Sequence, residues 1–315
     1  MRSVLEHAPR FDVEAAVKIA DEFFGLRGRA QSLPSERDQN FLLTDSAGKK
    51  FVLKIANALE SRAFLEAQNA ALKHVARRVS LCQSPLASVS GDDIASIRQG
   101  GGTYFARLVG YLPGVPLAQA QPQSPALLRD LGRKLGQLNW ALSDFDHPAV
   151  HHDFHWDLAN GHRIIDQFAS LIEDGKLREL VLQCRIRIDE RLRRSVIHGD
   201  ANDYNVLVDP ERMIVTGLLD FGDLVYSYTV GDLAIAIAYV VLDKDDPRAV
   251  AREVIEGYTS EFRLLDEELE LLWPLVRLRL AMSVCMAARQ LRQQPENEYL
   301  RISQRSIEAS LPRLI

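Results

Sequence analysis

Two short segments of this chain combine the residue types that phosphoryl transfer requires. The first runs from His198 to Asn205 with the pattern His-Gly-Asp-x-x-x-x-Asn, and the second places Asp220 at the end of an apolar run. Phosphoryl transfer needs one carboxylate to accept or orient the proton of the attacking hydroxyl. It also needs a carboxylate and an amide oxygen to hold Mg²⁺ on the nucleotide phosphates. The spacing therefore predicts Asp200 as the catalytic base, and Asn205 and Asp220 as Mg²⁺ ligands.

Each of these side chains also has a purely structural interpretation. Asp200 alone would be a turn residue in a polar loop, and Asn205 and Asp220 both stand at strand–turn junctions. Linked motif positions coincide by chance far less often than single residues, so the combination favours the catalytic interpretation. His198 is predicted to brace the loop by hydrogen bonding. Asp223 is interpreted either as a further metal ligand or as a residue that caps the loop beside the metal.

A second set of candidates lies in the first third of the chain. Lys54 occupies the apolar strand pattern Phe-Val-Leu-Lys-Ile. In a kinase-like small lobe such a lysine contacts the α- and β-phosphates and pairs with a helix glutamate, whereas an edge-strand lysine facing water is the common alternative. The predicted partner is Glu66, inside the following helix, with Glu60 at the helix start as the second choice. The loop expected to cover the phosphates, 33–40, lacks glycine, so Ser35 and backbone amides are its candidate phosphate contacts.

Strand and helix patterns divide the chain near residue 110. Before it, period-two apolar patterns predict two hairpins and helical spacing predicts two helices. The hairpins pair 40–44 with 51–55 and 94–98 with 104–109, and the helices span 11–25 and 60–79. After 112–114 the patterns are mainly helical, apart from short strands around the catalytic motif. We therefore predict an α+β, bilobal fold, with a small antiparallel-sheet lobe at 1–110 that binds the nucleotide and a larger helical lobe at 111–315.

Composition excludes several other classes of protein. The chain has 315 residues, a formal net charge of −5 and 26% charged residues without a long Lys/Arg block, so we expect no nucleic-acid binding. Its 3 cysteines are isolated, which suits a reducing cytoplasm better than a disulfide framework. Neither a signal core nor an apolar run of roughly 18 residues is found, so no membrane association is expected. We expect a cytoplasmic monomer or homodimer.

A histidine-rich segment, 151–157, suggests a metal site at first sight. His151 and His155 have the i,i+4 spacing of zinc-binding helices, but no further ligand set closes such a site, so zinc is disfavoured. The favoured interpretation is a loop and helix start that border the acceptor site. In this interpretation Trp156 forms an apolar wall, and Asp153 or Asp157 is a polar neighbour of the acceptor.

These residues together resemble the aminoglycoside phosphotransferase and small-molecule kinase family. The family pattern His-Gly-Asp-x-x-x-x-Asn is met by 198–205, and its Ile/Leu-Asp-Phe/Trp pattern by 219–221. Gly199 stands where protein kinases have arginine, and no Ala-Pro-Glu segment follows Asp220, so small-molecule kinases are favoured over protein kinases. The resemblance implies a protein-kinase-like fold, Mg²⁺ as cofactor, and ATP or GTP as co-substrate.

A finer resemblance is to hydroxylysine kinases and to the kinase domains attached to some aminotransferases. It lies in three segments, 34–40, 154–158 and 218–227. It implies an amino-alcohol or amino-acid acceptor such as hydroxylysine. By analogy, the hinge should bind the purine through the backbone of Gly110 and Leu112.

The sequence thus predicts a kinase that moves the γ-phosphate of a nucleotide to a hydroxyl of a small cationic or zwitterionic metabolite. Asp203, Tyr204 and Asp223, beside the catalytic loop, are expected to contribute to the acceptor site, where a carboxylate would meet the ammonium of the substrate. An aminoglycoside antibiotic phosphotransferase and a homoserine- or choline-type kinase are alternatives with the same chemistry. A nucleotide-binding pseudokinase is the alternative of another class, and the complete catalytic set disfavours it.

Overall fold

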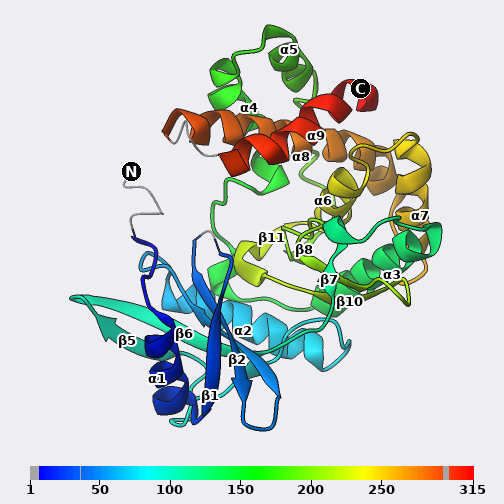
Figure 1. Ribbon diagram of the computed structural model, residues 1–315. Helices are drawn as coiled ribbons and strands as arrows, with labels where there is room; N and C mark the ends of the chain where they lie inside the picture. The colour runs from blue at the N-terminus through cyan, green and yellow to red at the C-terminus, as the bar shows by residue number, and fades with distance from the viewer. Residues whose placement is uncertain (1–6, 36, 294–297) are drawn as a thin grey trace. The chain divides into compact units, whose positions relative to one another are not determined.

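The computed structural model describes residues 7–35, 37–293 and 298–315. The chain divides into two compact units, Met1–Pro113 and Gly114–Ile315, which differ in architecture (Figure 1). The first is built around an antiparallel sheet and the second is mainly helical.

The sheet of the first unit has the strand order β1-β2-β3-β6-β4, with β5 paired to β6. Its strands are β1 (Gly28–Leu33), β2 (Gln39–Asp45), β3 (Lys50–Ile55), β4 (Pro85–Leu86), β5 (Ala95–Gln99) and β6 (Gly102–Gly110). β2 and β3 form the first predicted hairpin and β5 and β6 the second, so both hairpins are confirmed. Sequence patterns do not predict β1, because Arg29, Gln31 and Ser32 make it polar. It is an edge strand, paired in this sheet with β2.

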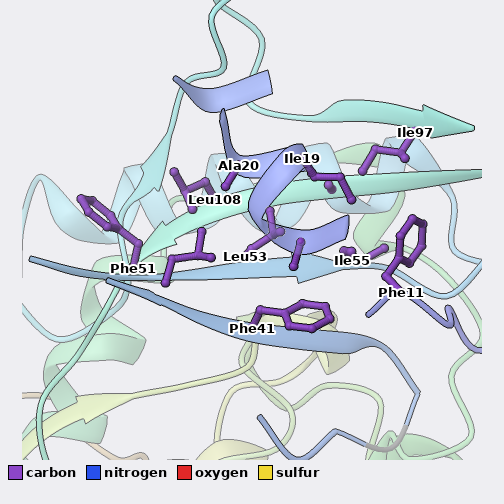
Figure 2. Packing of buried hydrophobic residues seen from close by; sticks show 12 residues of the cluster. Phe11, Ile19, Ala20, Phe41, Phe51, Leu53, Ile55, Ile97 and Leu108 are labelled. Atoms are coloured by element: carbon purple, nitrogen blue, oxygen red, sulfur yellow. The ribbon is translucent and has the colours of Figure 1, made fainter. Parts of the chain in front are cut away.

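One face of this sheet packs against helix α1 (Val13–Phe24). The helix begins after Asp12, whose carboxylate accepts a hydrogen bond from the Ala15 N–H, and it ends at Gly25 in the left-handed conformation. The shared core includes Phe11, Ile19, Ala20, Phe41, Phe51, Leu53, Ile55, Ile97 and Leu108 (Figure 2). Because side chains alternate along a strand, Lys54 lies on the face of β3 opposite to this core.

The second unit contains two small pieces of sheet among its helices. Strands β7 (Val115–Pro116), β9 (Val206–Asp209) and β10 (Ile214–Leu218) form one piece, and β8 (Arg194–Ile197) and β11 (Val225–Tyr228) form the other. The helices are α3 (Pro125–Leu142), α4 (Gly161–Phe168), α5 (Gly175–Gln183), α6 (Gly231–Val240), α7 (Pro247–Thr259), α8 (Asp266–Gln293) and α9 (Glu298–Leu314).

In the first unit, α2 (Arg62–Ala76) begins after Ser61, whose hydroxyl accepts from the Phe64 N–H at 3.1 Å.

Glycines let helices α3 and α7 approach closely. A Cβ atom at Gly132 would collide with the Val254 carbonyl, and one at Gly257 would collide with the Arg129 carbonyl. The close crossing brings Asn139 of α3 to Tyr258 of α7, whose hydroxyl donates to the Asn139 Oδ1 at 2.7 Å. Both side chains are fully buried. They form the base on which the catalytic loop is held.

Helix α8 is the central helix of the second unit. Within the described part of the chain it alone is long and apolar enough to cross a membrane by length and composition. Its apolar stretch is 72% buried inside the protein, as in the core helix of a globular fold. Arg277 and Arg279 interrupt that stretch, and the second of these is buried in the candidate active site.

Candidate active site

The hairpin of β9 and β10 brings Asn205 and Asp220 together. In its register Val206 lies opposite Leu218, and the Leu219 N–H donates to the Asn205 carbonyl at 2.8 Å. Asn205 directly precedes β9 and Asp220 follows β10 after one residue. The two side chains therefore emerge at the same end of one hairpin, although fourteen other residues separate them in the sequence.

The chemistry of these two side chains fits Mg²⁺. The Asn205 Nδ2 donates to both the carbonyl oxygen and Oδ2 of Asp200, each at 2.9 Å, so its amide oxygen is the atom left for a cation. Asp220 is held in the left-handed conformation with φ 62°, and its Oδ1 accepts from the Gly222 N–H at 3.1 Å. The described residues hold no cluster of three or more His, Cys, Asp or Glu side chains suited to a metal. One amide and one carboxylate suffice for Mg²⁺ when phosphates and waters supply the other ligands.

Asp200 is fixed by three side-chain donors. Its Oδ2 accepts from Asn202 and Asn205, each at 2.9 Å, and its Oδ1 accepts from the Arg279 Nη2 at 2.8 Å. Asn202 also shapes the loop, because its Oδ1 accepts from the Tyr204 N–H at 2.8 Å. The sequence motif does not reveal the contributions of Asn202 and Arg279. The available signal for Arg279 was a charged residue, like Arg277, within the apolar stretch of α8.

The carboxylate of Asp232 holds the backbone of the catalytic loop. It accepts from the N–H groups of His198 at 3.0 Å and Gly199 at 2.8 Å, and from the side chain of Asn139 at 2.8 Å. Asp232 is fully buried and lies inside α6 rather than at its N-cap, which is Val230. The position of Asp232 in the sequence, after a glycine and at a helix start, favours a capping role. The tertiary contacts show instead that its carboxylate holds the backbone of the catalytic loop.

His198 braces the same loop, as its position in the motif predicts. Its Nε2 lies 2.9 Å from the Leu219 carbonyl, and its Nδ1 lies 3.2 Å from the Asp200 nitrogen, which can only donate. These partners fit a neutral ring protonated on Nε2. The ring also packs edge-on against Phe221 at 4.8 Å between centroids. His198 thus ties the catalytic loop to the turn that carries Asp220.

Gly199 is required at its position by both backbone and space. Its φ is 80°, and a Cβ atom there would collide with the Asp223 carbonyl. A side chain of any size would push the catalytic loop away from 220–223. The glycine that distinguishes this motif from the protein-kinase pattern is therefore a packing requirement of this site.

In the first unit Glu66, the predicted partner of Lys54, is engaged within its own helix. Its carboxylate is half-exposed and bonds to Arg62 at 2.9 Å, and pairing with Lys54 stays a prediction. Helix α2 turns its buried face, with Gln68 and Asn69, toward the unit and leaves Glu66 in solvent. Glu60, the second choice, is partly buried, and desolvation raises the pKa of its carboxyl.

The loop between β1 and β2 contains Ser35, as predicted for a phosphate-covering loop. Ser35 is exposed, and its hydroxyl accepts from the Asn40 Nδ2 at 3.2 Å. The Asp38 carboxylate accepts from the Asn57 N–H at 3.0 Å, which anchors the loop to the residues after β3. A phosphate contact of Ser35 stays a prediction.

In the predicted hinge, the backbone of Gly110 makes hydrogen bonds inside the first unit. The Gly110 N–H donates to the Ser84 carbonyl at 2.9 Å, and the Gly110 carbonyl accepts from the Gln83 side chain at 3.1 Å. Its N–H is already used inside the unit, so Gly110 is not placed to donate to a purine. A backbone contact from Leu112 stays a prediction.

Three of the predicted acceptor residues lie beside the catalytic loop with different surroundings. Tyr204 is 58% exposed, whereas Asp223 is buried. Burial raises the pKa of Asp203 to about 6, opposed in part by a backbone hydrogen bond and by Lys244. An ammonium group bound at Asp203 would offset this desolvation, which makes Asp203 the strongest candidate of the three for the amine of an acceptor.

The segment 151–160 is a series of turns with a short 3-10 helix, not the helix that the i,i+4 histidine spacing requires. The His151 Nε2 lies 2.6 Å from the Asp146 Oδ1, and its ring packs on that of Tyr226. These contacts, and not a metal shared with His155, account for the position of the His151 ring. Asp157 has a local structural role. Its Oδ1 accepts from Ser227 and from the Ala159 N–H, so it fixes the segment, and its contact with an acceptor stays a prediction.

Trp156 packs against the cluster of Phe154, Ile197 and Val225. Its ring also faces the Arg279 guanidinium at 4.8 Å. Trp156, the predicted wall of the acceptor site, is therefore separated from the Asp200 carboxylate by Arg279. Contact of Trp156 with an acceptor stays a prediction.

Comparison with known proteins agrees with this chemistry. The sequence model of the phosphotransferase enzyme family (APH) matches residues 29–271. Hydroxylysine kinase of Mus musculus is 33% identical over 94% of this chain and 87% of its own length. A structure of an amicoumacin kinase in complex with AMP-PNP, Ca²⁺ and Ami superposes with a TM-score of 0.74 at 16% identity, covering 96% of this chain and 93% of that one. A microcompartment-associated aminopropanol kinase superposes with a TM-score of 0.72 at 16% identity, covering 95% of both chains. The predicted kinase-like order, an antiparallel sheet followed by a helical region, is confirmed.

Proposed function

Because this chain belongs to the phosphotransferase enzyme family, we propose that it phosphorylates a hydroxyl group of a small amino acid or amino alcohol of the hydroxylysine type. The family relation makes it a phosphotransferase that acts on hydroxyl-bearing small molecules with a nucleotide as co-substrate. The finer assignment is carried by one observation, the relationship to hydroxylysine kinase along nearly the whole chain. The name of the aminopropanol kinase, an amino-alcohol kinase of similar fold, supports the same acceptor class.

The arrangement of the catalytic loop supports a defined division of labour. Asp200 is placed to accept the proton of the acceptor hydroxyl, and Asn205 and Asp220 would hold Mg²⁺ through their side-chain oxygens. Lys54 is assigned to the phosphates of the nucleotide, ATP or GTP. The metal would supply charge neutralisation on the phosphate oxygens. Positioning and charge neutralisation supply most of the catalysis of phosphoryl transfer, so a loop with this many fixed donors suits the reaction.

The electrostatics beside the loop support a cationic acceptor. Asp203 is a partly buried carboxylate whose pKa burial raises to about 6. An isolated buried charge is costly, and a substrate ammonium next to Asp203 would lower that cost. We therefore expect the enzyme to prefer an amino alcohol to a neutral diol of the same shape.

The first experiment is an acceptor panel with purified protein and Mg²⁺. Hydroxylysine, aminopropanol, homoserine, choline, an aminoglycoside and amicoumacin are each tested with ATP and with GTP, and nucleoside diphosphate is measured. The proposal expects the highest kcat/KM for hydroxylysine or a similar amino alcohol. Preference for an antibiotic would instead make the protein an antibiotic phosphotransferase. This is the second candidate function, favoured by the fold likeness to amicoumacin kinase.

The second experiment compares an amino alcohol with the diol in which a hydroxyl replaces the amine. A kcat/KM ratio near one would show that the site does not recognise the ammonium. The variant Asp203→Asn is the matched control, because it should reduce the preference without removing any of the catalytic carboxylates.

A further inference from the structure

An arginine from the central helix contacts the candidate catalytic base. The Arg279 Nη2 of α8 donates to the Asp200 Oδ1 at 2.8 Å, although 78 residues lie between them in the sequence. Arg279 is 2% exposed. It belongs neither to the His-Gly-Asp motif nor to the Leu-Asp-Phe motif, so the motifs assign it no role.

The hydrogen bonds of Asp200 leave one place for a substrate proton. An ionised carboxylate has about four lone-pair sites, two on each oxygen. Asn202 and Asn205 fill both sites on Oδ2, and Arg279 fills one on Oδ1. Among the described contacts, the remaining site is on Oδ1, the oxygen that Arg279 holds. The orientation of that oxygen therefore decides where an acceptor hydroxyl can donate.

Arg279 is itself fixed from three sides. Its Nη1 donates to the Trp156 carbonyl at 3.1 Å, and its Nε lies 3.4 Å from the Tyr239 hydroxyl. Its guanidinium lies over the rings of Trp156, at 4.8 Å, and Tyr239, at 5.8 Å. A guanidinium sandwiched in this way and almost without exposure has little surface to offer to a substrate.

We infer that Arg279 is a positioning residue, which aims Oδ1 of Asp200 at the acceptor hydroxyl and does not itself bind the acceptor. This inference rests on the role proposed above for Asp200 as the base. The planar fork of arginine suits the task, because it holds a carboxylate oxygen in a set direction while its other donors hold the protein. Through the Trp156 carbonyl it also couples the base to the segment 151–160.

The test is a double-mutant cycle on turnover with the best acceptor from the panel. Arg279→Met should lower kcat by about 100-fold, the size of effect that a misplacement of roughly 1 Å produces, with little change in the KM of acceptor or nucleotide. In the Asp200→Asn background the same change should cost less than about 3-fold, because a base that is gone can no longer be misplaced. Arg279→Lys should recover only part of kcat, since lysine lacks the fork.

Two further variants separate positioning from general damage. Tyr239→Phe removes only the hydroxyl that contacts the Nε and should lower kcat by several-fold without a change in KM. Arg277→Met is the matched control on α8. Two residues along a helix turn a side chain by roughly 200°, so Arg277 lies on another face, and its variant should keep wild-type kcat. Unfolding midpoints of all variants show whether each protein is folded.

Independent effects of Arg279→Met and Asp200→Asn, whose product equals the loss in the double variant, would overturn the inference. So would a rise in acceptor KM with unchanged kcat, which would make Arg279 a binding residue. If Arg279→Met does not fold, Tyr239→Phe and Arg279→Lys decide the matter by the same split between kcat and KM. Failure of hydroxylysine and of every similar amino alcohol as acceptor refutes the proposed function alone, because any accepted hydroxyl compound serves this cycle.

Discussion

The Asp232 carboxylate offers the clearest link between stability and catalysis in this protein. It is fully buried and accepts three hydrogen bonds, of which two come from the backbone of His198 and Gly199. The third comes from the Asn139 side chain and reaches the same oxygen, Oδ2, as the His198 N–H. Oδ1 serves Gly199 alone among the described residues.

Asp232→Asn keeps the shape and replaces one acceptor by a donor. If the amide oxygen takes the place of Oδ2, the amide N–H₂ faces the Gly199 N–H, and two donors are left unsatisfied. Each buried unsatisfied donor costs about 1–3 kcal/mol, and the two remaining bonds lose their charge assistance. Partial relaxation reduces the sum, so we expect a loss of about 3 kcal/mol in the free energy of unfolding. Because Gly199 adjoins Asp200, kcat should fall as well.

Urea unfolding followed by fluorescence measures the loss, with kcat measured on the folded protein. The control is Asp189→Asn, a change at an exposed carboxylate paired with Arg191, which should leave the urea midpoint close to that of the wild type because solvent screens the pair. A loss below about 1 kcal/mol for Asp232→Asn, or an unchanged kcat, would show that the carboxylate does not hold the loop.

Four further outcomes follow from the same structure. Asp200→Asn should lower kcat by orders of magnitude with little change in nucleotide affinity, measured by binding of a nucleotide analogue. Asp220→Ala should abolish turnover at any Mg²⁺ concentration, and in a crystal with nucleotide the ion should lie about 2.0–2.1 Å from its oxygen ligands in the wild type. Gly199→Arg should destabilise the fold and abolish activity together, because a Cβ there collides with the Asp223 carbonyl; a folded, active variant would contradict this. Desolvation raises the pKa of Asp157, so the folded state binds the proton more tightly than the unfolded state, and stability should fall as pH rises above the ordinary carboxyl range. Asp157→Asn should flatten that slope in thermal unfolding measured across pH.

Sequence alone predicted much of the fold, because its signals are local. The hairpins of β2 with β3 and of β5 with β6 follow from period-two apolar patterns with turn residues between them. The sequence did not predict the edge strand β1, because this polar strand is held by pairing with β2 and not by an apolar face of its own. The sequence pattern also predicts Glu66 as a partner of Lys54, and only the fold shows that the opposite face of α2 is buried and that Glu66 lies beside Arg62.

For the site, the sequence by itself predicted the reacting groups, since motif spacing indicates the loop and hairpin that carry Asp200, Asn205 and Asp220. Only the tertiary structure decided what holds them. Arg279 and Asp232 reach the loop from helices α8 and α6, at separations of 79 and 34 residues, where no local pattern records the contact. Buried polar groups must find partners wherever the packing of helices brings them. Those partners are set by which helix faces meet, a property that emerges when the chain is folded.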